Sequence, residues 1–233
     1  SNPAAEVDPP KFIGAPMKVL TEAQLDTFMT AIERDEFWHD FFYTAVTTGL
    51  RRGEICALRW EDFDAKQETL HVRRTLHKEK GKPLTTGNTK TYAGTRKIVL
   101  PPSTAQLLRE RKKTAPTEWI FPNPFDPEQP IAPGTAYNRL KALLKETGLP
   151  DIRFHDLRHT FATHALSSGV DAKTLAGILG HTKASFTLDT YTHTTGDMQK
   201  RAAEIVGGFL TDYLGEEMNP WQSRENMAAA PSV

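Results

Sequence analysis

The sequence predicts an α+β fold that is mainly α, with one small antiparallel sheet of three strands. Two observations support this prediction. Apolar residues recur at helical spacing along most of the chain, whereas the period-two alternation of strands is confined to short stretches between Leu70 and Leu100. A chain of 233 residues can bury one sizeable core. We therefore expect a single folded domain with flexible ends.

Three helices are predicted before the sheet. Thr21 and Gln24 have the spacing of a capping box, and apolar residues follow them at helical spacing. A second helix is expected from Phe37 to Thr48 and should end at Gly49. The chain should then turn sharply before Glu54 and start a third helix. This third helix would carry Ile55, Leu58 and Trp60.

The sheet is predicted from two alternating segments, Leu70 to Thr75 and Arg96 to Leu100. The turn candidates between them are Gly81-Lys82 and Ala93-Gly94. After Pro101-Pro102, six further helices are expected: Ser103 to Arg111, Thr135 to Thr147, His155 to Ser168, Asp171 to Leu179, Ser185 to Tyr191 and Met198 to Leu214. The proline-rich segment 116–133 is predicted to be a long loop.

Composition divides the chain into three parts. Residues 1–20 hold four prolines and few apolar residues, which is typical of an extended linker. Residues 21–214 carry the predicted helices and strands, and residues 215–233 form a polar tail. No apolar run is long enough to span a membrane, and the start lacks a signal-peptide pattern. The single cysteine, Cys56, allows no internal disulfide, which fits a protein of the reducing cytoplasm. Cys56 also lies in an apolar helix pattern, so we expect it to be a core residue.

The formal net charge is zero, but the basic residues are unevenly placed. Residues 70–100 carry eight Lys and Arg against a single acidic residue, Glu79. Such a run favours a basic surface that could neutralise the phosphates of a nucleic acid. An exposed charged hairpin without a partner remains the alternative.

One short segment concentrates the chemically useful side chains. Residues 154–164 read Phe-His-Asp-Leu-Arg-His-Thr-Phe-Ala-Thr-His. At helical spacing, His155, Arg158 and His159 lie on one side, while an apolar stripe lies on the other. An imidazole and a guanidinium near the positive end of a helix dipole suit an anion with several oxygens, such as phosphate.

Further motifs accompany this segment in a fixed order along the chain. They are Thr48-Gly49-Leu50-Arg51-Arg52-Gly53-Glu54, Thr89-Lys90-Thr91 before Arg96-Lys97-Ile98-Val99-Leu100, Leu179-Gly180-His181, and Tyr191 ten residues after that histidine. In this order they resemble the catalytic domain of the tyrosine recombinases, the phage-integrase family. The likeness is greatest to integrases of temperate phages and conjugative transposons, and it runs from about Leu20 to about Leu214.

The resemblance implies a catalytic role for six residues. Tyr191 would be the nucleophile, and Arg51 and Arg158 would hold the scissile phosphate from two sides, as planar guanidinium groups do well. His155 would act as general base or acid, because its ordinary pKa is near neutral. His181 would donate a hydrogen bond to the same phosphate. Lys90, expected near a hairpin tip, would protonate the departing 5′ oxygen.

Other residues are expected to support the site or to bind DNA. Glu54 could pair with Arg51 and fix its rotamer, or it could be a solvated charge. His159 is expected to make a structural hydrogen bond. The DNA-binding candidates are Arg73, Arg74, Lys82, Arg96 and Lys97.

The resemblance implies a site-specific recombinase that cuts and rejoins double-stranded DNA through a 3′-phosphotyrosine bond, without a metal or other cofactor. It further implies four protomers on two DNA sites and a place at the bacterial nucleoid in the cytoplasm. A directionality factor is a possible further partner. The helix from Met198, with the tail, would dock on a neighbouring subunit or on its own core. In the family a helical DNA-binding domain precedes this one, so the chain is interpreted as a fragment.

Three alternatives stay open from the sequence. A type IB topoisomerase shares the chemistry but rejoins the same strand, and a DNA-binding module could have lost catalysis. His155, His159 and His164 also suggest a metal site. The metal interpretation is weaker because Arg158 lies between the first two histidines and would repel a dication.

Overall fold

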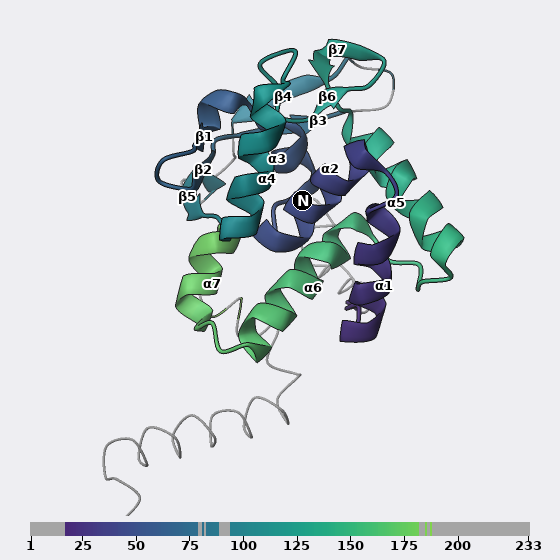
Figure 1. The fold of residues 1–233 in the computed structure, drawn as a ribbon. Helices are drawn as coiled ribbons and strands as arrows, with labels where there is room; N and C mark the ends of the chain where they lie inside the picture. Colours follow the sequence, from purple (N-terminus) through teal and green to yellow (C-terminus); the bar gives the residue numbers. More distant parts are fainter. Residues whose placement is uncertain are drawn as a thin grey trace, which may run out of the picture.

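The computed structural model describes residues 17–78, 81, 83–88, 94–181, 185 and 187. Its α-helices are α1 (Glu22–Ile32), α2 (Glu36–Thr48), α3 (Arg52–Cys56), α4 (Pro102–Lys113), α5 (Pro133–Thr147), α6 (Phe154–Ser167) and α7 (Ala172–Leu179), with a 3-10 turn η2 (Trp60–Asp62). Its strands are β1 (Phe63–Asp64), β2 (Thr69–Val72), β3 (Arg74–His77), β4 (Thr85–Asn88), β5 (Arg96–Val99), β6 (Pro122–Asn123) and β7 (Asp126–Pro130). The prediction of a mainly helical α+β fold is confirmed (Figure 1).

Helix α1 begins where the sequence predicts. The Thr21 side chain accepts a hydrogen bond from the Gln24 amide at 3.3 Å, and the Gln24 side chain accepts one from the Thr21 amide at 3.0 Å. This capping box satisfies two backbone donors that a helix start leaves free. Phe28 and Ile32 are the buried residues of the helix.

Helix α2 is the centre of the packing. It packs against α1, α3, α4 and α6, and its Phe41 and Phe42 are fully buried. The two rings meet edge to face at 5.4 Å between centroids, and Phe41 also meets Phe121 in the same way at 5.2 Å. Such aromatic pairs bury large apolar areas and favour this edge-to-face geometry. The helix ends at Gly49, in the left-handed conformation (φ 61°).

The sheet region differs in detail from the prediction. The three-stranded antiparallel sheet has the order β1-β2-β5, with Leu70 opposite Ile98 and both side chains buried. The predicted strand from Leu70 to Thr75 is divided at Arg73, because β3 leaves this sheet and pairs with β4 as a separate ladder. Arg74 starts β3 beside Asp62, with which it forms an ion pair.

Two further predictions are wrong. The predicted third helix is short, because α3 ends at Cys56 and Trp60 lies in the turn η2. The predicted loop over residues 116–133 contains a hairpin, in which β6 and β7 pair antiparallel. Ile120, Phe121 and Ile131 are fully buried on either side of this hairpin. These apolar anchors let the proline-rich segment form strands.

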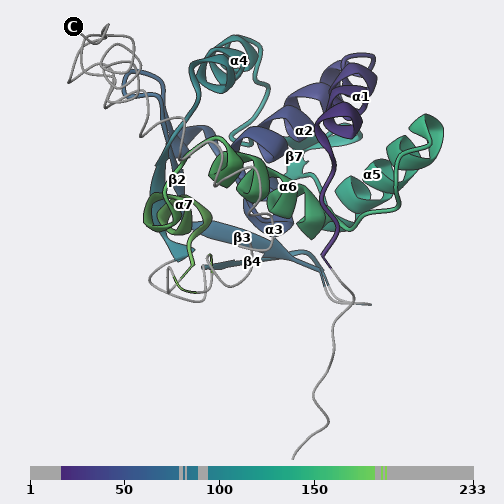
Figure 2. The ribbon, with the colours of Figure 1, turned by 90° about the horizontal axis from the view of Figure 1, so that it is seen from below.

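The buried residues form two clusters. The larger one lies around α2 and extends to the sheet. A small one joins α6 to α7 and comprises Ala162, Leu166, Leu175 and Leu179. Seen from below, α1, α2 and α5 lie on one side, while β2, β3, β4 and α7 lie on the other, with α6 between them (Figure 2). Helix α6 therefore connects the helical side to the side that carries the sheets.

No helix among the residues that the structure describes is long and apolar enough to cross a membrane. The predicted linker is described only from residue 17 onward. The predicted helices from Ser185 and from Met198, and the tail, lie outside the described residues, apart from residues 185 and 187.

Candidate active site

Arg51 lies in the turn between α2 and α3. Its backbone amide donates to Glu54 Oε2 at 2.9 Å, and its Nη1 donates to Glu54 Oε1 at 2.7 Å. One carboxylate thus fixes both the start of α3 and the arginine rotamer. The Arg51 side chain remains 39% exposed, whereas that of Glu54 is only 2% exposed. The expected pairing of Glu54 with Arg51 is therefore present, and Arg51 stays accessible.

Gly49 brings this turn against α6. A Cβ atom at Gly49 would overlap the Phe161 ring and touch Leu179, so only glycine fits here, and the positive φ adds a second reason. The close approach lets Arg158 Nη1 donate to the Gly49 carbonyl at 2.9 Å. The turn that carries Arg51 and the helix that carries Arg158 are thereby joined.

The C-terminal end of α7 is held by three arginines. Successive carbonyl oxygens accept hydrogen bonds from different guanidinium groups: Ile178 from Arg96 Nε at 2.6 Å, Leu179 from Arg158 Nη2 at 2.6 Å and Gly180 from Arg51 Nη2 at 3.3 Å. The last carbonyls of a helix lack partners within the helix and carry its negative dipole end. Cationic donors therefore suit them well, and they fix the residue that follows, His181.

His181 lies near the guanidinium groups of Arg158 and Arg51 on one side and contacts Thr187 on the other. Its Nδ1 lies 2.8 Å from Thr187 Oγ1. Burial, and then the charges of Arg158 and Arg51, lower the pKa of His181 to about 4. The imidazole is therefore neutral at pH 7 in the absence of an anion. A bound phosphate would oppose the arginine charges and favour the protonated, doubly donating form.

His155 lies in the first turn of α6, beside the same arginines. Burial, followed by the charges of Arg158 and Arg51, lowers its pKa from the ordinary value. Its ring meets the His159 ring edge to face, with centroids 4.6 Å apart. Burial, and next the charge of His155, lower the pKa of His159 to about 4. Both rings are thus neutral at pH 7, and a neutral His155 is able to accept a proton.

Arg153 is the N-cap residue of α6, and a buried carboxylate caps the helix there. Asp156 Oδ2 accepts from the Arg153 amide at 2.7 Å, and both carboxylate oxygens accept from the Arg153 guanidinium. This contact orients the first turn, which carries His155. Sequence reasoning missed Asp156 as a supporting residue, although its position three residues after the helix start was a signal of a cap.

Arg96 is placed differently from the prediction. Its side chain is only 7% exposed, and its two terminal nitrogens donate to the Glu54 carboxylate at 3.0 and 2.9 Å. Burial alone would raise the pKa of Glu54, but the hydrogen bond and charge of Arg96, and then Arg51, outweigh it and hold this pKa below its ordinary value. Arg96 is therefore a buried partner of Glu54, and a contact of Arg96 with DNA stays a prediction.

Strand periodicity was the signal that could have placed Arg96. Successive side chains of a strand face opposite sides, and Ile98 on β5 is buried whereas Val99 is 75% exposed. Arg96 shares its side of the strand with Ile98. An arginine on the buried side needs a carboxylate, and Glu54 supplies it.

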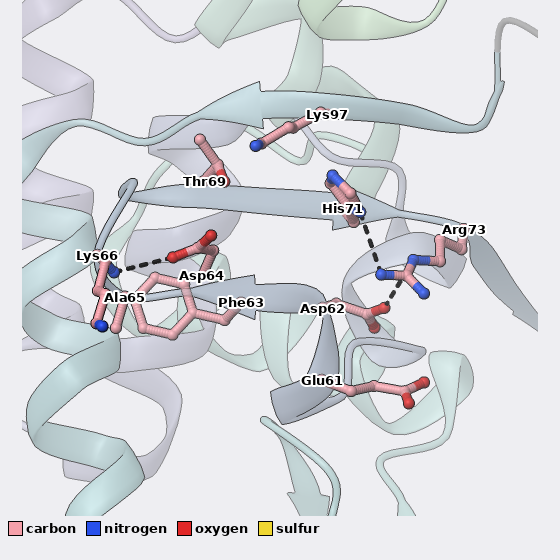
Figure 3. A pocket seen from close by; sticks show the side chains of 10 residues that line it. All are labelled: Glu61, Asp62, Phe63, Asp64, Ala65, Lys66, Thr69, His71, Arg73 and Lys97. Carbon is pink, nitrogen blue, oxygen red and sulfur yellow. Dashed lines mark hydrogen bonds and ion pairs between the residues drawn. The ribbon is translucent and has the colours of Figure 1, made fainter.

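The other described DNA-binding candidates lie around the sheet. Arg74 pairs with Glu61 and Asp62, and Lys97 Nζ donates to Gln67 Oε1 at 2.6 Å. Figure 3 shows Arg73 and Lys97 beside a cavity of about 460 Å³ that also contains acidic side chains. Arg73 is turned towards Asp62 and His71 in this view. Among the described residues, nearby carboxylates pair with Arg73 and with Arg74, so this part of the surface carries both signs of charge.

Three predicted site residues, Lys82, Lys90 and Tyr191, lie outside the described residues. The described catalytic and supporting candidates form one cluster: Arg51 comes from the α2–α3 turn, Glu54 from α3, His155, Arg158 and His159 from α6, and His181 from the end of α7. Within the described ranges, no group of three or more His, Cys, Asp or Glu side chains is arranged to hold a metal ion. The third histidine of the metal alternative, His164, has its Nε2 2.9 Å from the Leu20 carbonyl oxygen.

Comparison of the sequence with known proteins points to the same family as the motifs in this cluster. The model of the phage integrase family matches residues 18–197. A XerC-like tyrosine recombinase of Caldanaerobacter subterraneus is 30% identical over 188 residues, which cover 71% of this chain and 48% of that protein. The ICEBs1 integrase of Bacillus subtilis is 28% identical over 208 residues, covering 83% of this chain and 55% of that protein. The chain thus spans about half the length of the curated relatives it matches.

Structure comparisons agree as well. The Tn1549 transposon integrase, solved in complex with transposon right end DNA, superimposes with a TM-score of 0.71 at 25% identity, covering 84% of this chain and 68% of that one. The XerA recombinase shares the fold with a TM-score of 0.64 at 21% identity, covering 81% and 65% of the two chains. The ordered motifs, the arginine and histidine cluster and these matches together show that the chain belongs to the phage integrase family of tyrosine recombinases.

Proposed function

We propose that this chain is the catalytic domain, over residues 21–214, of a site-specific DNA recombinase that works through a 3′-phosphotyrosine bond. One observation carries the proposal. Arg51, Arg158 and His181 come from separate segments, yet Arg158 bonds the carbonyl oxygens of Gly49 and Leu179 on either side. Two guanidinium groups and two neutral imidazoles around one point suit the transfer of a phosphoryl group.

Arg51 and Arg158 would bind the non-bridging oxygens of the scissile phosphate. Arg51 offers an exposed guanidinium. Arg158 is 2% exposed, and its Nη1 and Nη2 donate to the Gly49 and Leu179 carbonyl oxygens, which hold the guanidinium where the α2–α3 turn, α6 and α7 meet. His181 would donate to the same phosphate from the end of α7.

In the proposed reaction the phenol oxygen of Tyr191 attacks phosphorus, and the bond from phosphorus to the 5′ oxygen breaks. Neutral His155 accepts the phenol proton, and Lys90 donates a proton to the departing 5′ oxygen. A 5′ hydroxyl from a partner duplex then attacks the phosphotyrosine and reverses the steps. The covalent bond conserves the energy of the phosphodiester, so the reaction uses neither ATP nor a metal.

We further propose double-stranded DNA as the partner, bound by four protomers at two sites in the bacterial nucleoid, with a directionality factor as an additional partner. Support comes from the relatives, since the Tn1549 integrase was solved with transposon DNA and a XerH recombinase with its difH substrate. The topoisomerase alternative receives no such support, because the relatives reported above are recombinases and integrases.

A suicide substrate tests the proposal. The cognate duplex, selected from a random-sequence pool and nicked beside the scissile phosphate, should trap a covalent adduct whose linked residue maps by mass spectrometry to Tyr191. Tyr191→Phe should abolish the adduct and retain DNA binding, whereas the matched variant Tyr213→Phe should form it normally. Strand exchange between two labelled duplexes distinguishes a recombinase from a topoisomerase. A wild-type protein that binds this DNA and forms no adduct contradicts the proposal.

A further inference from the structure

A second cavity, of about 260 Å³, opens beside Arg51 and His155. Its lining includes two other arginines, Arg52 and Arg153, and Tyr137 of α5, while the remaining lining residues, Leu50 and Phe154, are apolar. Among the described residues that line it there is no carboxylate. The volume is several times the roughly 30 Å³ that a water molecule occupies in the liquid, so a hydrated oxyanion fits.

The cavity flanks the catalytic cluster and is not its centre. Arg158 and His181 do not line it, whereas Arg51 and His155 do. These two residues thus form a wall shared by the catalytic cluster and the cavity. The other polar lining residues, Arg52, Arg153 and Tyr137, would contact a different part of the same ligand.

The guanidinium of Arg52 is oriented by an aromatic ring and can bind an anion. Its guanidinium carbon lies 5.6 Å from the centre of the Tyr137 ring, a stack that orients the group and keeps its charge. Within the described part of the chain no carboxylate pairs with Arg52. The neighbouring carboxylate of Glu54 is already engaged by Arg51 and Arg96 and is only 2% exposed.

Arg153 forms another side of the cavity with half of its side chain exposed. Two of its nitrogens, Nε and Nη2, donate to Asp156 at 3.1 and 2.7 Å. The remaining nitrogen, Nη1, has no bond to any described residue. The guanidinium is thus fixed in direction by a buried carboxylate and presents one edge outward. The surroundings of the neighbouring His155 are positively charged: burial, and then the charges of Arg158 and Arg51, lower its pKa.

We infer that Arg52 and Arg153 form a subsite for the DNA phosphate next to the scissile one on the cleaved strand. Successive phosphates of a strand are only about 3.4 Å apart along the helix axis, so a ligand whose scissile phosphate meets Arg51 brings its neighbour to this cavity. The inference rests on the proposed function and adds two positioning residues to it. The second phosphate would set the register of the strand before Tyr191 reacts.

Methylphosphonate substitution tests the subsite. In a Tyr191→Phe background, the affinity for the cognate duplex is measured with one neutral methylphosphonate at either phosphate flanking the scissile one. Arg52→Ala should weaken binding to the natural duplex about tenfold, as expected for a lost charged hydrogen bond. The methylphosphonate at the phosphate bound by the subsite should weaken DNA binding by the parent protein by a similar factor. It should cause no further loss of DNA affinity in Arg52→Ala.

Arg59→Ala is the matched control, because Arg59 also stacks on an aromatic ring, with its guanidinium carbon 4.4 Å from the centre of Trp119, but outside this cavity. It should keep the full methylphosphonate effect. If Arg52→Ala unfolds, Arg52→Gln replaces it, because glutamine keeps the first three side-chain carbons and a polar end but carries no charge. If a methylphosphonate weakens DNA binding by Arg52→Ala as much as it weakens binding by the parent protein at both flanking positions, the subsite is overturned. This holds even if the wild-type protein forms the adduct and the proposed function stands. Absence of DNA binding and of any adduct overturns the proposed function, and this inference with it.

Discussion

Glu54 holds two arginines with one carboxylate and is almost fully buried. Its oxygens accept from Arg51 and from Arg96 at 2.7 to 3.0 Å. Each arginine also reaches a carbonyl at the end of α7. A single side chain thereby links the accessible Arg51 to the buried Arg96.

We predict that Glu54→Ala destabilises the fold by about 3–5 kcal/mol, because it leaves two guanidinium groups without their buried partner. Urea unfolding followed by circular dichroism measures this loss. Glu61→Gln is the control, since Glu61 also pairs with an arginine but is exposed, and its unfolding midpoint should hardly change. Equal midpoints for Glu54→Ala and wild type would contradict the structural role.

The same pair predicts a pH dependence. The folded-state pKa of Glu54 lies below its ordinary value of 4.5, so its stabilisation is complete above about pH 4.5 and is lost as the pH falls through the folded pKa. The difference in unfolding free energy between wild type and Glu54→Ala should be constant from pH 7 to about pH 5 and shrink below it. A difference that shrinks between pH 7 and pH 5 would point to another group.

At the scale of elements, the α2–α3 turn depends on Gly49. We predict that Gly49→Ala loses roughly 1–2 kcal/mol from its left-handed backbone and about 1–3 kcal/mol more from overlap with the Phe161 ring. It should also slow adduct formation, because Arg51 follows this turn. Gly148→Ala isolates the backbone cost, since Gly148 has a similar φ of 68° and no described atom within 4 Å of an added Cβ. Similar stability for the two variants would disprove the close contact.

At the scale of the whole molecule, the two buried clusters predict two levels of stability. Leu175→Ala removes contacts from the small cluster between α6 and α7, and Leu140→Ala removes them from the large one. Local openings of weakly anchored elements proceed without global unfolding. Hydrogen exchange should therefore accelerate in α7 alone for Leu175→Ala, and throughout α2 and α7 for Leu140→Ala. Uniform acceleration by both variants would show one cooperative unit.

Much of this arrangement could be predicted from the sequence, and the exceptions have physical reasons. The capping box at Thr21 and the helix end at Gly49 are local signals, so α1 and α2 lie where they were predicted. The hairpin of β6 and β7 depends on burial of Phe121 and Ile131 against distant residues, which local composition does not reveal. The role of Arg96 depends on Glu54, more than forty residues away. The catalytic roles of all six candidates remain predictions: Arg51, Lys90, His155, Arg158, His181 and Tyr191.

The arginine grip on the end of α7 has an entropic consequence. Ordering a long side chain at an interface costs about 0.5–1.5 kcal/mol. Arg51 and Arg158 already hold fixed rotamers through backbone carbonyls, so folding has met this cost before any nucleic acid arrives. In the proposed reaction, phosphate binding by these two groups would therefore require little rearrangement of the protein, and little of the free energy of each phosphate contact would be lost to ordering of the side chains.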